Sequence, residues 1–409
     1  MKIFKKSLSI LLCLAMIMSL FVGIGTLTAS AVTSESYAGQ GTDADPYVIA
    51  SLANLKYLSE QSNDFSGKYI RLDADVDVSG SGITTIFNTF NGTFDGNGHT
   101  ISNISIEKSS ANAGFIIQTG GCTIKNLTLS GKVTGSSNNV GGFIGVANSG
   151  AKVKLINCVN KINVKGTYAV GGFIGRAQCA LVEISDSVND GNVSATSTSN
   201  NSVTGGFIGI LGDGSTTSAV CPNVNITGCI NNGNVTSPRN DADANIGGFI
   251  GQTSDSTSKT VNIKFSQNNG SISASTGVGG ASVAGIIGKV HKETVNISYC
   301  INLGAITGRT NVGGIIGYNQ TQDNSKITVR NCFTYGKLST SATSGSVKIG
   351  AIFGQHHNDQ TNRQVCINSF YNSDDIVWNG RTEDTGTWGH TNHGTEKTIS
   401  SAVEEYYRF

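Results

Sequence analysis

The side chains best suited to binding a ligand or a metal gather near the C-terminus of the chain. Both tryptophans of the sequence, Trp378 and Trp388, lie there together with His390 and His393. An indole offers a flat apolar face with a polar edge, and imidazole is the commonest metal ligand among side chains. The tail therefore predicts either a sugar-stacking platform or a metal contact. The simpler interpretation, which we favour, is a C-terminal cap in which the tryptophans cover the end of the fold.

A second group of acidic side chains lies in a predicted strand at residues 69–78. Asp73, Asp75 and Asp77 alternate there with apolar residues, so their carboxylates would share one outward face. Such a row could bind calcium. Alternate carboxylates on one strand lie about 7 Å apart, however, and need further loop ligands to close a site. We therefore expect a solvated strand face with Arg71 as a partial counter-charge.

Two histidine-containing groups complete the candidate sites. Asp95 and His99 are close enough to interact, most simply as a hydrogen bond that stabilises a turn. His356 and His357 precede Asp359 in a predicted loop, and the three residues are a weak candidate for a metal site.

The remaining charges do not suggest an enzyme. Carbohydrate-active enzymes on β-helices group acidic residues on one exposed face. Here the charges fall singly along the repeats, at Glu183, Asp186, Asp190, Lys264 and Arg330. We assign no catalytic residue, no cofactor and no metal ligand, and the sequence lacks a His-Glu-x-x-His motif.

These residues belong to a repeat array that runs from about residue 100 to residue 370. One column of the repeat holds a small or apolar residue, here called the anchor, at Ile104, Leu127, Cys158, Ser187, Cys229, Ser266, Cys300 and Cys332, with Cys366 or Ser369 as its last member. β-branched residues such as Val224 and Ile226 occupy the columns five and three positions before the anchor. Because cysteine shares the anchor column with leucine and isoleucine, we expect buried thiols rather than a disulfide framework. No pair of cysteines has the spacing of a zinc site.

Two further columns carry glycine and asparagine. The motif Gly-Gly-Phe-Ile-Gly recurs in strict or looser form, with its second glycine at Gly142, Gly172, Gly206, Gly248, Gly285 and Gly314. A phosphate-binding loop would need a following helix, and none is predicted here, so we expect the glycines to let the backbone turn a corner beside a neighbouring coil. Asparagine follows the anchor by two positions, at Asn160, Asn189, Asn231, Asn268 and Asn302. Amides stacked in such a column can hydrogen-bond along it.

One repeat is too small to bury its own apolar face. Each repeat contains three predicted strands, and stacking the repeats in register would turn the apolar columns into one continuous core. The sequence therefore predicts an all-β parallel β-helix of about eight or nine coils. Length varies at 194–204, 212–222 and 237–244, which we expect to bulge from the shaft as loops.

The ends of the chain differ from the repeats. Lys2, an apolar run and the small residues 29–31 predict a secretory signal peptide at 1–31. Residues 32–98 form a predicted N-terminal cap with the first strands and one short helix from Leu52 to about Gln61, capped by Ser51. The repeats then occupy 99–372 and the tail 373–409. Signal cleavage turns the formal net charge from +1 to about −2, so no basic patch favours nucleic acid.

The two recurring motifs resemble those of the GLUG-repeat family of bacterial secreted and surface proteins. Residues 41–47 and 92–101 are similar to the segment that commonly precedes those repeats. The resemblance covers roughly residues 40–372 and implies a right-handed β-helix of the pectate-lyase-like superfamily, usually found in adhesins and cell-wall proteins. It supplies no catalytic residues.

We therefore expect a secreted or cell-surface protein without a transmembrane segment after signal cleavage. Its expected role is non-catalytic adhesion or binding of an unidentified extracellular glycan or protein ligand, through loops on a rigid shaft. The alternative is a polysaccharide lyase or glycoside hydrolase built on the same fold.

Overall fold

The computed structural model of the chain describes residues 36–109, 112–136, 139–150, 152–196, 202–212, 221–238, 244–254, 256, 258–274, 281–320, 326–340, 348–356, 364–372 and 395–397. The predicted signal peptide at 1–31 and nearly all of the tail lie outside these ranges. So do the central parts of the three predicted loops, although Ser194 and Ser237 at their ends belong to strands.

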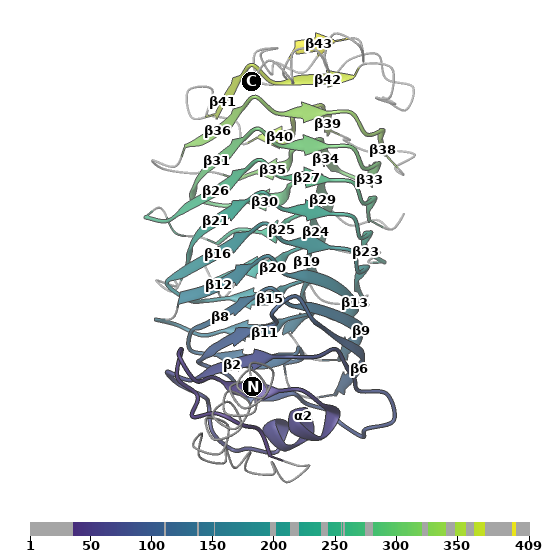
Figure 1. The fold of residues 1–409 in the computed structure, drawn as a ribbon. Helices are drawn as coiled ribbons and strands as arrows, with labels where there is room; N and C mark the ends of the chain where they lie inside the picture. The colour runs from purple at the N-terminus through teal and green to yellow at the C-terminus, as the bar shows by residue number, and fades with distance from the viewer. Residues whose placement is uncertain are drawn as a thin grey trace, which may run out of the picture.

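The described chain is a right-handed parallel β-helix (Figure 1). Every strand pairs in parallel with the equivalent strand of the next coil, so four sheets run along the shaft. The predicted all-β fold is confirmed. We name the sheets A to D.

Sheet A begins in the N-terminal segment and continues through the repeats. Its strands are β1 (Tyr47–Ile49), β2 (Tyr69–Leu72), β5 (Thr93–Asp95), β8 (Cys122–Lys125), β12 (Lys152–Ile156), β16 (Leu181–Ser185), β21 (Asn223–Thr227), β26 (Thr260–Lys264), β31 (Thr294–Ser298), β36 (Ile327–Arg330) and β41 (Gln364–Ile367). The segment before residue 99 therefore contributes strands to the same sheet as the repeats.

Sheet B begins with long strands and continues as two rows of short strands. Its first strands are β3 (Val76–Asp77) and the long strands β6 (Thr100–Lys108), β9 (Thr128–Gly135) and β13 (Val159–Gly166). It then divides into two rows. The first row is β17 (Val188–Asn189), β22 (Ile230–Asn231), β27 (Gln267–Asn268), β32 (Ile301–Asn302), β37 (Phe333–Thr334), β42 (Phe370–Asn372) and β43 (Thr395–Lys397). The second row is β18 (Val193–Ala195), β23 (Val235–Ser237), β28 (Ile272–Ala274), β33 (Ile306–Gly308) and β38 (Leu338–Thr340).

Sheets C and D complete each coil. Sheet C contains β4 (Phe87–Thr89), β7 (Ile116–Thr119), β11 (Ile144–Ala147), β15 (Ile174–Ala177), β20 (Ile208–Leu211), β25 (Ile250–Gln252), β30 (Ile287–Val290), β35 (Ile316–Asn319) and β40 (Phe353–His356). Sheet D contains β10 (Asn139–Gly141), β14 (Ala169–Gly171), β19 (Val203–Gly205), β24 (Ala244–Gly247), β29 (Ala281–Ala284), β34 (Asn311–Gly313) and β39 (Lys348–Gly350).

The glycine motif forms a corner between two strands rather than one buried strand. Gly171 ends β14, Phe173 lies in the bend, and Ile174 begins β15. Each repeat therefore contains more than the three predicted strands, because the glycine motif ends one strand and begins the next. The motif glycines are close-packed: a Cβ on Gly248 would lie only 2.6 Å from Oδ1 of Asn268. Their predicted role beside a neighbouring coil is confirmed.

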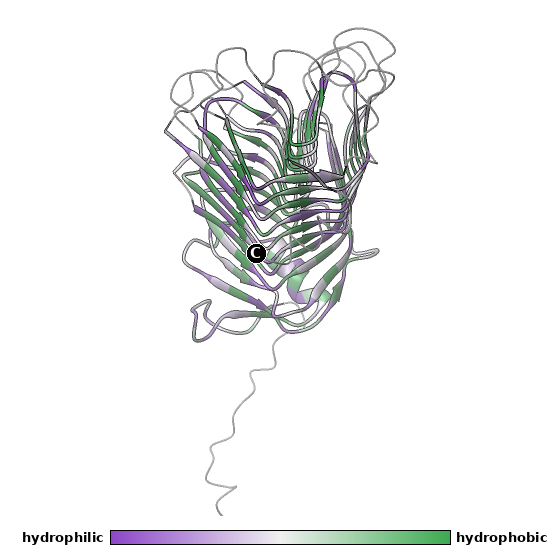
Figure 2. Cartoon of the chain, turned by 90° about the horizontal axis from the view of Figure 1, so that it is seen from above, coloured by the Kyte–Doolittle hydropathy of each residue, from purple (hydrophilic) through white to green (hydrophobic). Residues whose placement is uncertain are grey.

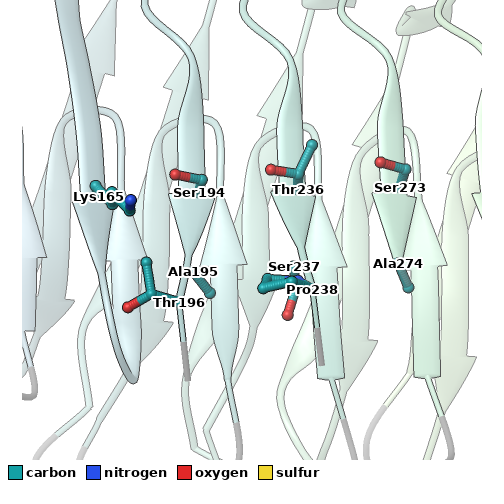
Figure 3. Close-up of a pocket in the computed structure, with 9 residues that line it drawn as sticks. All are labelled: Lys165, Ser194, Ala195, Thr196, Thr236, Ser237, Pro238, Ser273 and Ala274. Carbon is teal, nitrogen blue, oxygen red and sulfur yellow. The ribbon is translucent and has the colours of Figure 1, made fainter. Parts of the chain in front are cut away.

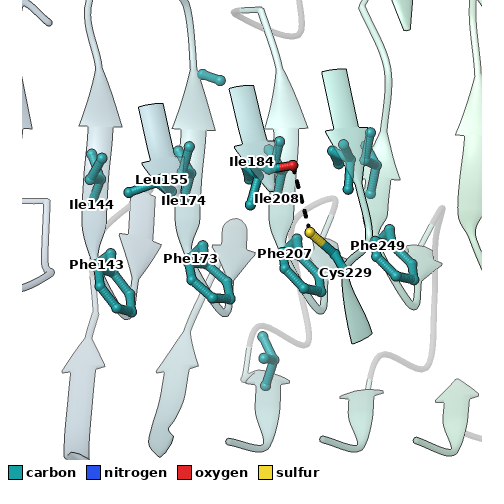
Figure 4. Close-up of a cluster of buried hydrophobic side chains, with 14 of the residues drawn as sticks. Phe143, Ile144, Leu155, Phe173, Ile174, Ile184, Phe207, Ile208, Cys229 and Phe249 are labelled. Atoms are coloured by element: carbon teal, nitrogen blue, oxygen red, sulfur yellow. Dashed lines mark hydrogen bonds between the residues drawn. The ribbon is translucent and has the colours of Figure 1, made fainter. Parts of the chain in front are cut away.

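The apolar columns align as predicted. Val224 pairs with Val261 and Val261 pairs with Val295 along sheet A, and all three are fully buried. Hydrophobic residues recur along the strands that wall the shaft when it is viewed from above (Figure 2). At the corner between sheets D and C, the rings of Phe143, Phe173, Phe207 and Phe249 stack at 4.8 to 4.9 Å (Figure 4). Aromatic pairs of this kind contribute about 0.5–1.5 kcal/mol each beyond their area burial.

The asparagine column forms a continuous hydrogen-bonded ladder inside the shaft. From Asn160 to Asn302, each side-chain amide donates to the Oδ1 of the next asparagine at 2.7 Å. From Asn189 onward each amide also donates to the carbonyl two residues later, as Asn268 does to Gly270 at 2.9 Å. The ladder predicted from the sequence is confirmed, and it satisfies amides that are fully buried.

No cysteine of the described chain forms a disulfide. Cys158, Cys229, Cys300 and Cys332 are fully buried in the core, as predicted. The Cys229 thiol donates to the Ile184 carbonyl at 3.6 Å (Figure 4). Burial raises the pKa of the Cys158 and Cys229 thiols to about 12. These thiols are therefore unreactive near neutral pH.

The short helix α2 (Leu52–Ser59) lies at the N-terminal end of the shaft (Figure 1). Ser51 caps it by accepting a hydrogen bond from the Asn54 amide at 3.2 Å, and the helix ends two residues before the predicted Gln61. Nothing helical in the described ranges has the length and apolarity needed to cross a membrane.

Candidate functional site

A shallow groove of about 470 Å³ runs along the second row of sheet B (Figure 3). The outward residue of each strand lines it, so the lining follows one column of the repeat: Lys165, Ser194, Thr236 and Ser273. These side chains are partly or fully exposed. The groove therefore presents an ammonium group and then one hydroxyl per coil, at intervals of about 4.8 Å.

The hydroxyl column continues beyond the groove. Ser273 pairs with Thr307, and Thr307 pairs with Ser339. The hydroxyls of Thr307 and Ser339 lie 2.9 Å apart and hydrogen-bond to each other. A hydroxyl both donates and accepts, so this wall can match many arrangements of polar groups on a ligand.

A second feature lies at the turn between sheets A and B. The residue directly before the anchor column has positive φ in successive coils, at Asn103, Asn126, Asn157, Asp186, Gly228, Phe265, Tyr299, Asn331 and Asn368. Asparagine, aspartate and glycine tolerate this left-handed conformation, whereas bulky side chains rarely adopt it. Phe265 and Tyr299, at φ 50° and 55°, depart from the column's usual residue types.

The two aromatic residues stack on each other at the surface. Their ring centroids lie 5.0 Å apart and the ring planes differ by 17°. Phe265 is 59% exposed. The exposed residues Lys264 and Arg330 end strands β26 and β36 at the same turn, on either side of the coil that carries Tyr299. The pair is therefore an accessible aromatic surface with nearby positive charge.

The predicted ligand residues of the tail, Trp378, Trp388, His390 and His393, lie outside the described residues. The same holds for His357 and Asp359. Their proposed roles stay predictions.

The acidic segment at 69–78 does not form one strand. The chain leaves sheet A after Leu72 and enters sheet B at Val76, so Asp73 and Asp75 lie at a corner. Asp73 accepts two hydrogen bonds from Arg71, the shorter at 2.6 Å. The predicted counter-charge is thus present, but the row of outward carboxylates is not.

Each of these carboxylates has its own partner. Hydrogen bonding by Arg71 holds the pKa of Asp73 below its ordinary value, and the Thr100 amide does the same for the pKa of Asp75. Asp77 accepts from the Asn103 side chain at 2.9 Å. Among the described residues, no three His, Cys, Asp or Glu side chains gather as a metal site would require.

Asp95 and His99 do not form the predicted contact with each other, and each has other partners. His99 Nδ1 lies 3.2 Å from Asp75, which the corner at residues 73–75 brings beside it. Asp95 instead pairs with Lys125 at 3.1 Å and accepts from the Asn97 amide within its own turn. A turn-stabilising hydrogen bond is therefore present, with a different donor.

Two of the five single charges along the repeats, Glu183 and Asp190, have partners in a neighbouring coil. Glu183 forms an ion pair with Lys154 of the preceding coil at 2.8 Å. Asp190 accepts from the Asn232 side chain of the next coil at 2.8 Å. Exposed pairs of this kind contribute little to stability, about 0–1 kcal/mol.

One buried carboxyl was missed by the sequence analysis. Glu293 is 1% exposed and accepts hydrogen bonds from the Thr253 hydroxyl at 2.6 Å and from the Ser254 hydroxyl. Burial raises its pKa to about 7. Because both hydroxyl partners come from the preceding coil, about 40 residues away, only the coil register could reveal this site.

The stacked pair and the groove were also missed, although the sequence carries a signal for both. The column before the anchor reads as turn-forming residues interrupted only by Phe265 and Tyr299. The column seven positions after the anchor reads as an unbroken series of hydroxyl residues from Ser194 to Ser339.

No protein-family model matches the chain. Halomucin from Haloquadratum walsbyi (strain DSM 16790 / HBSQ001) is 36% identical over 173 residues, which cover 37% of this chain and 2% of Halomucin. The chain thus spans a very small part of the length of the curated relative it matches. A crystal structure of a candidate immunoglobulin A1 protease from Bacteroides ovatus aligns with 90% of this chain and 89% of its own at 16% identity and a TM-score of 0.41. The chain is a parallel β-helix with local similarity to a segment of Halomucin.

Proposed function

We propose that this protein is an extracellular, non-catalytic β-helix of the GLUG-repeat type that binds a glycan or protein ligand. The observation that carries the proposal is the groove on sheet B, where successive coils present Ser194, Thr236 and Ser273 in register. A regular row of hydroxyls on a rigid wall suits a polymer whose polar groups also recur at regular intervals.

The difference between the inward and the outward columns of the repeat supports this role. The inward columns are uniform, since valine, isoleucine, phenylalanine and asparagine recur in them from coil to coil. Among the outward columns, the groove column keeps a hydroxyl in successive coils, and the column of the aromatic pair changes residue type. On such a scaffold, function resides in the exposed residues, which the repeated core geometry holds in place.

The predicted signal peptide supports export, and the repeat motifs support the family resemblance. The tail tryptophans Trp378 and Trp388 are proposed as a further contact or as a cap. Fluorescence quenching by soluble glycans distinguishes these two roles, because buried tryptophans would not respond.

The test is a glycan-array screen of the mature protein, paired with an assay for released oligosaccharide on every glycan that binds. We expect binding without bond cleavage. Release of oligosaccharide would replace this proposal with the carbohydrate-active enzyme, and absence of binding to every glycan of the array would reject a glycan as the ligand.

A groove variant makes the test specific. Thr236→Val with Ser273→Ala removes two hydroxyls at nearly constant shape and should weaken binding. Thr328→Val on sheet A is the matched control, since it removes a half-exposed hydroxyl from a different wall. Equal binding by both variants would show that the groove is not the contact surface.

A further inference from the structure

A second column of polar side chains runs beside the hydroxyl column of the groove. In the coil of β18, Asn192 and Ser194 flank the fully buried Val193, so both lie on the outer face of sheet B, about 7 Å apart. The adjacent coils repeat this arrangement. The second column, here called the amide column, contains four residues that are at least partly exposed: Asn163, Asn192, Asn234 and Ser271.

Each asparagine of the amide column is held by the next coil. The Asn163 Oδ1 accepts a hydrogen bond from the Asn192 backbone N–H at 3.1 Å, and the Asn192 Oδ1 accepts one from the Asn234 N–H at 3.0 Å. The Asn234 Oδ1 accepts from both the N–H and the hydroxyl of Ser271, at 3.0 and 2.7 Å. Because these bonds use the amide oxygens, the Nδ2 groups remain as donors, one in each coil.

The polar groups of both columns are unpaired within the protein. In the described ranges, no group accepts a hydrogen bond from the three asparagine Nδ2 groups of the amide column, and none bonds to the three hydroxyls of the groove. The three hydroxyls point in the same direction along the shaft (Figure 3). Polar groups that a rigid wall already orients lose little conformational freedom when a ligand binds them.

Both columns of unpaired groups cover the same coils. Beyond the groove, Thr307 and Ser339 use their hydroxyls on each other, and Ala305 replaces the polar residue of the amide column. On the other side the amide column continues with Lys132, whose ammonium group pairs with Glu107 at 2.7 Å. The unpaired groups therefore occupy four coils, and these are the coils whose residues line the groove of about 470 Å³.

The spacing of this surface fits a straight polysaccharide better than a peptide. The coils rise by about 4.8 Å, whereas an extended peptide presents side chains on one face about every 7 Å. A β-1,4-linked pyranose chain is a flat ribbon that advances by nearly one coil per sugar and carries oxygen atoms along both edges. An α-1,4-linked chain coils and cannot follow a straight row.

The charge of the surface favours a neutral polysaccharide. Lys165 is the one charged side chain among the described residues that line the groove. A polyuronate would place a carboxylate on every sugar, and most of these carboxylates would have no cation opposite them.

We propose that the groove and the amide column together bind a neutral β-1,4-linked glycan that lies along the shaft, with one sugar per coil over four coils. The asparagine Nδ2 groups donate to oxygens on one edge of the ribbon, and the groove hydroxyls exchange hydrogen bonds with the other edge. This inference names the ligand class of the groove and rests on the proposed function.

The first test measures how affinity depends on the length and linkage of the glycan. Cello-oligosaccharides and N-acetylated chito-oligosaccharides of three to six sugars are titrated into the full mature protein by calorimetry, with maltohexaose as the α-1,4-linked comparison. We expect affinity for at least one β-1,4-linked series to rise up to four sugars and then to level off, and maltohexaose to bind at least about tenfold more weakly. Affinity that still rises from four to six sugars, or equal binding of maltohexaose, would contradict the assignment.

The second test uses Asn192→Ala, which removes one Nδ2 donor from the amide column. It should weaken binding of the tetrasaccharide by about fivefold, because one hydrogen bond to the ligand is lost. Unchanged binding by this variant would show that the amide column has a structural role alone and would overturn the inference.

Asn223→Ala is the matched control on a different wall. Asn223 is exposed on sheet A, and its Oδ1 accepts a hydrogen bond from the Thr260 backbone N–H at 3.0 Å. Its Nδ2, like that of Asn192, has no partner in the part of the chain that the structure describes. The control therefore loses the same kind of contact with the next coil, and it should bind the tetrasaccharide like the wild type.

The outcomes separate this inference from the proposed function. If neither β-1,4-linked series binds, but the array identifies another glycan whose binding is weakened by Thr236→Val with Ser273→Ala, this inference fails and the proposed function stands. If no glycan of the array binds, this inference and the glycan form of the proposed function both fail.

Discussion

The side-chain amide of Asn231 donates a hydrogen bond to the Oδ1 of Asn268 at 2.7 Å, although 37 residues separate them in the chain. Both side chains are fully buried, and the bond is one rung of the ladder that links consecutive coils.

Asn268→Ala should destabilise the protein by about 2–4 kcal/mol, because it removes hydrogen bonds and leaves one of the two N–H groups of the buried Asn231 amide without its acceptor. Denaturant unfolding measures the loss. Asn269→Ala is the control, since Asn269 makes similar amide contacts at the exposed surface and should change stability by only about 0.5 kcal/mol. Equal effects at the two positions would contradict the structural role of the ladder.

Gly248→Ala should destabilise the protein by about 3 kcal/mol or more, because the added methyl group would overlap the backbone of Gly285 and lie 2.6 Å from Asn268 Oδ1. Thermal unfolding provides the measurement. Gly120→Ala serves as the comparison, since a Cβ there meets only the Asn91 side chain at 3.3 Å. A Gly248→Ala protein as stable as the comparison would show that the corner can widen.

Thiol titration should find eight thiols when the mature protein is unfolded without reductant, because the eight cysteines of the described chain form no disulfide. The folded protein should react slowly at pH 8, since burial raises the pKa of Cys158 and Cys229 to about 12. Cys366, which is only half-buried, should react first. Detection of no thiols after unfolding would mean that the cysteines are paired.

Glu293 should make stability depend on pH. Burial raises its pKa from 4.5 to about 7 in the folded protein, so the folded state binds the proton more tightly than the unfolded state does. This contribution is complete below about pH 4.5 and is lost as the pH rises through about 7.

Glu293→Gln should therefore remove this dependence and should be more stable than the wild type at pH 8 by about 3 kcal/mol. Unfolding free energies of both proteins between pH 4.5 and 8 provide the check. Glu183→Gln, at a half-exposed ion pair, should show a much smaller difference across the range. A constant difference between wild type and Glu293→Gln would rule out titration of Glu293.

The inward columns that recur in many coils could be identified from the sequence, whereas the hydroxyl column of the groove and the features that occur once were missed. The register of Val224 and Val261, the asparagine ladder and the buried anchor cysteines each appear in many coils, so their columns are visible without a structure. Asp73 and Asp75 alternate like strand residues, yet they lie at a corner because the next strand pairs in sheet B.

The missed features depend on contacts between coils of unequal length. The partners of Glu293 lie in the preceding coil, and the stack of Phe265 and Tyr299 joins two neighbouring coils. Local sequence patterns do not reveal such pairs, since the spacing between equivalent positions varies from coil to coil.

The pairing of Val182 with Val224, and of Val224 with Val261, has an evolutionary consequence. Because each winding presents nearly the same surface to the winding before and after it, deletion of the segment from Val224 to the residue before Val261 would bring Val182 directly against Val261. Duplication of such a segment would lengthen the molecule just as readily. Unequal recombination within such a gene can therefore change the length of the encoded β-helix without requiring a new hydrophobic core.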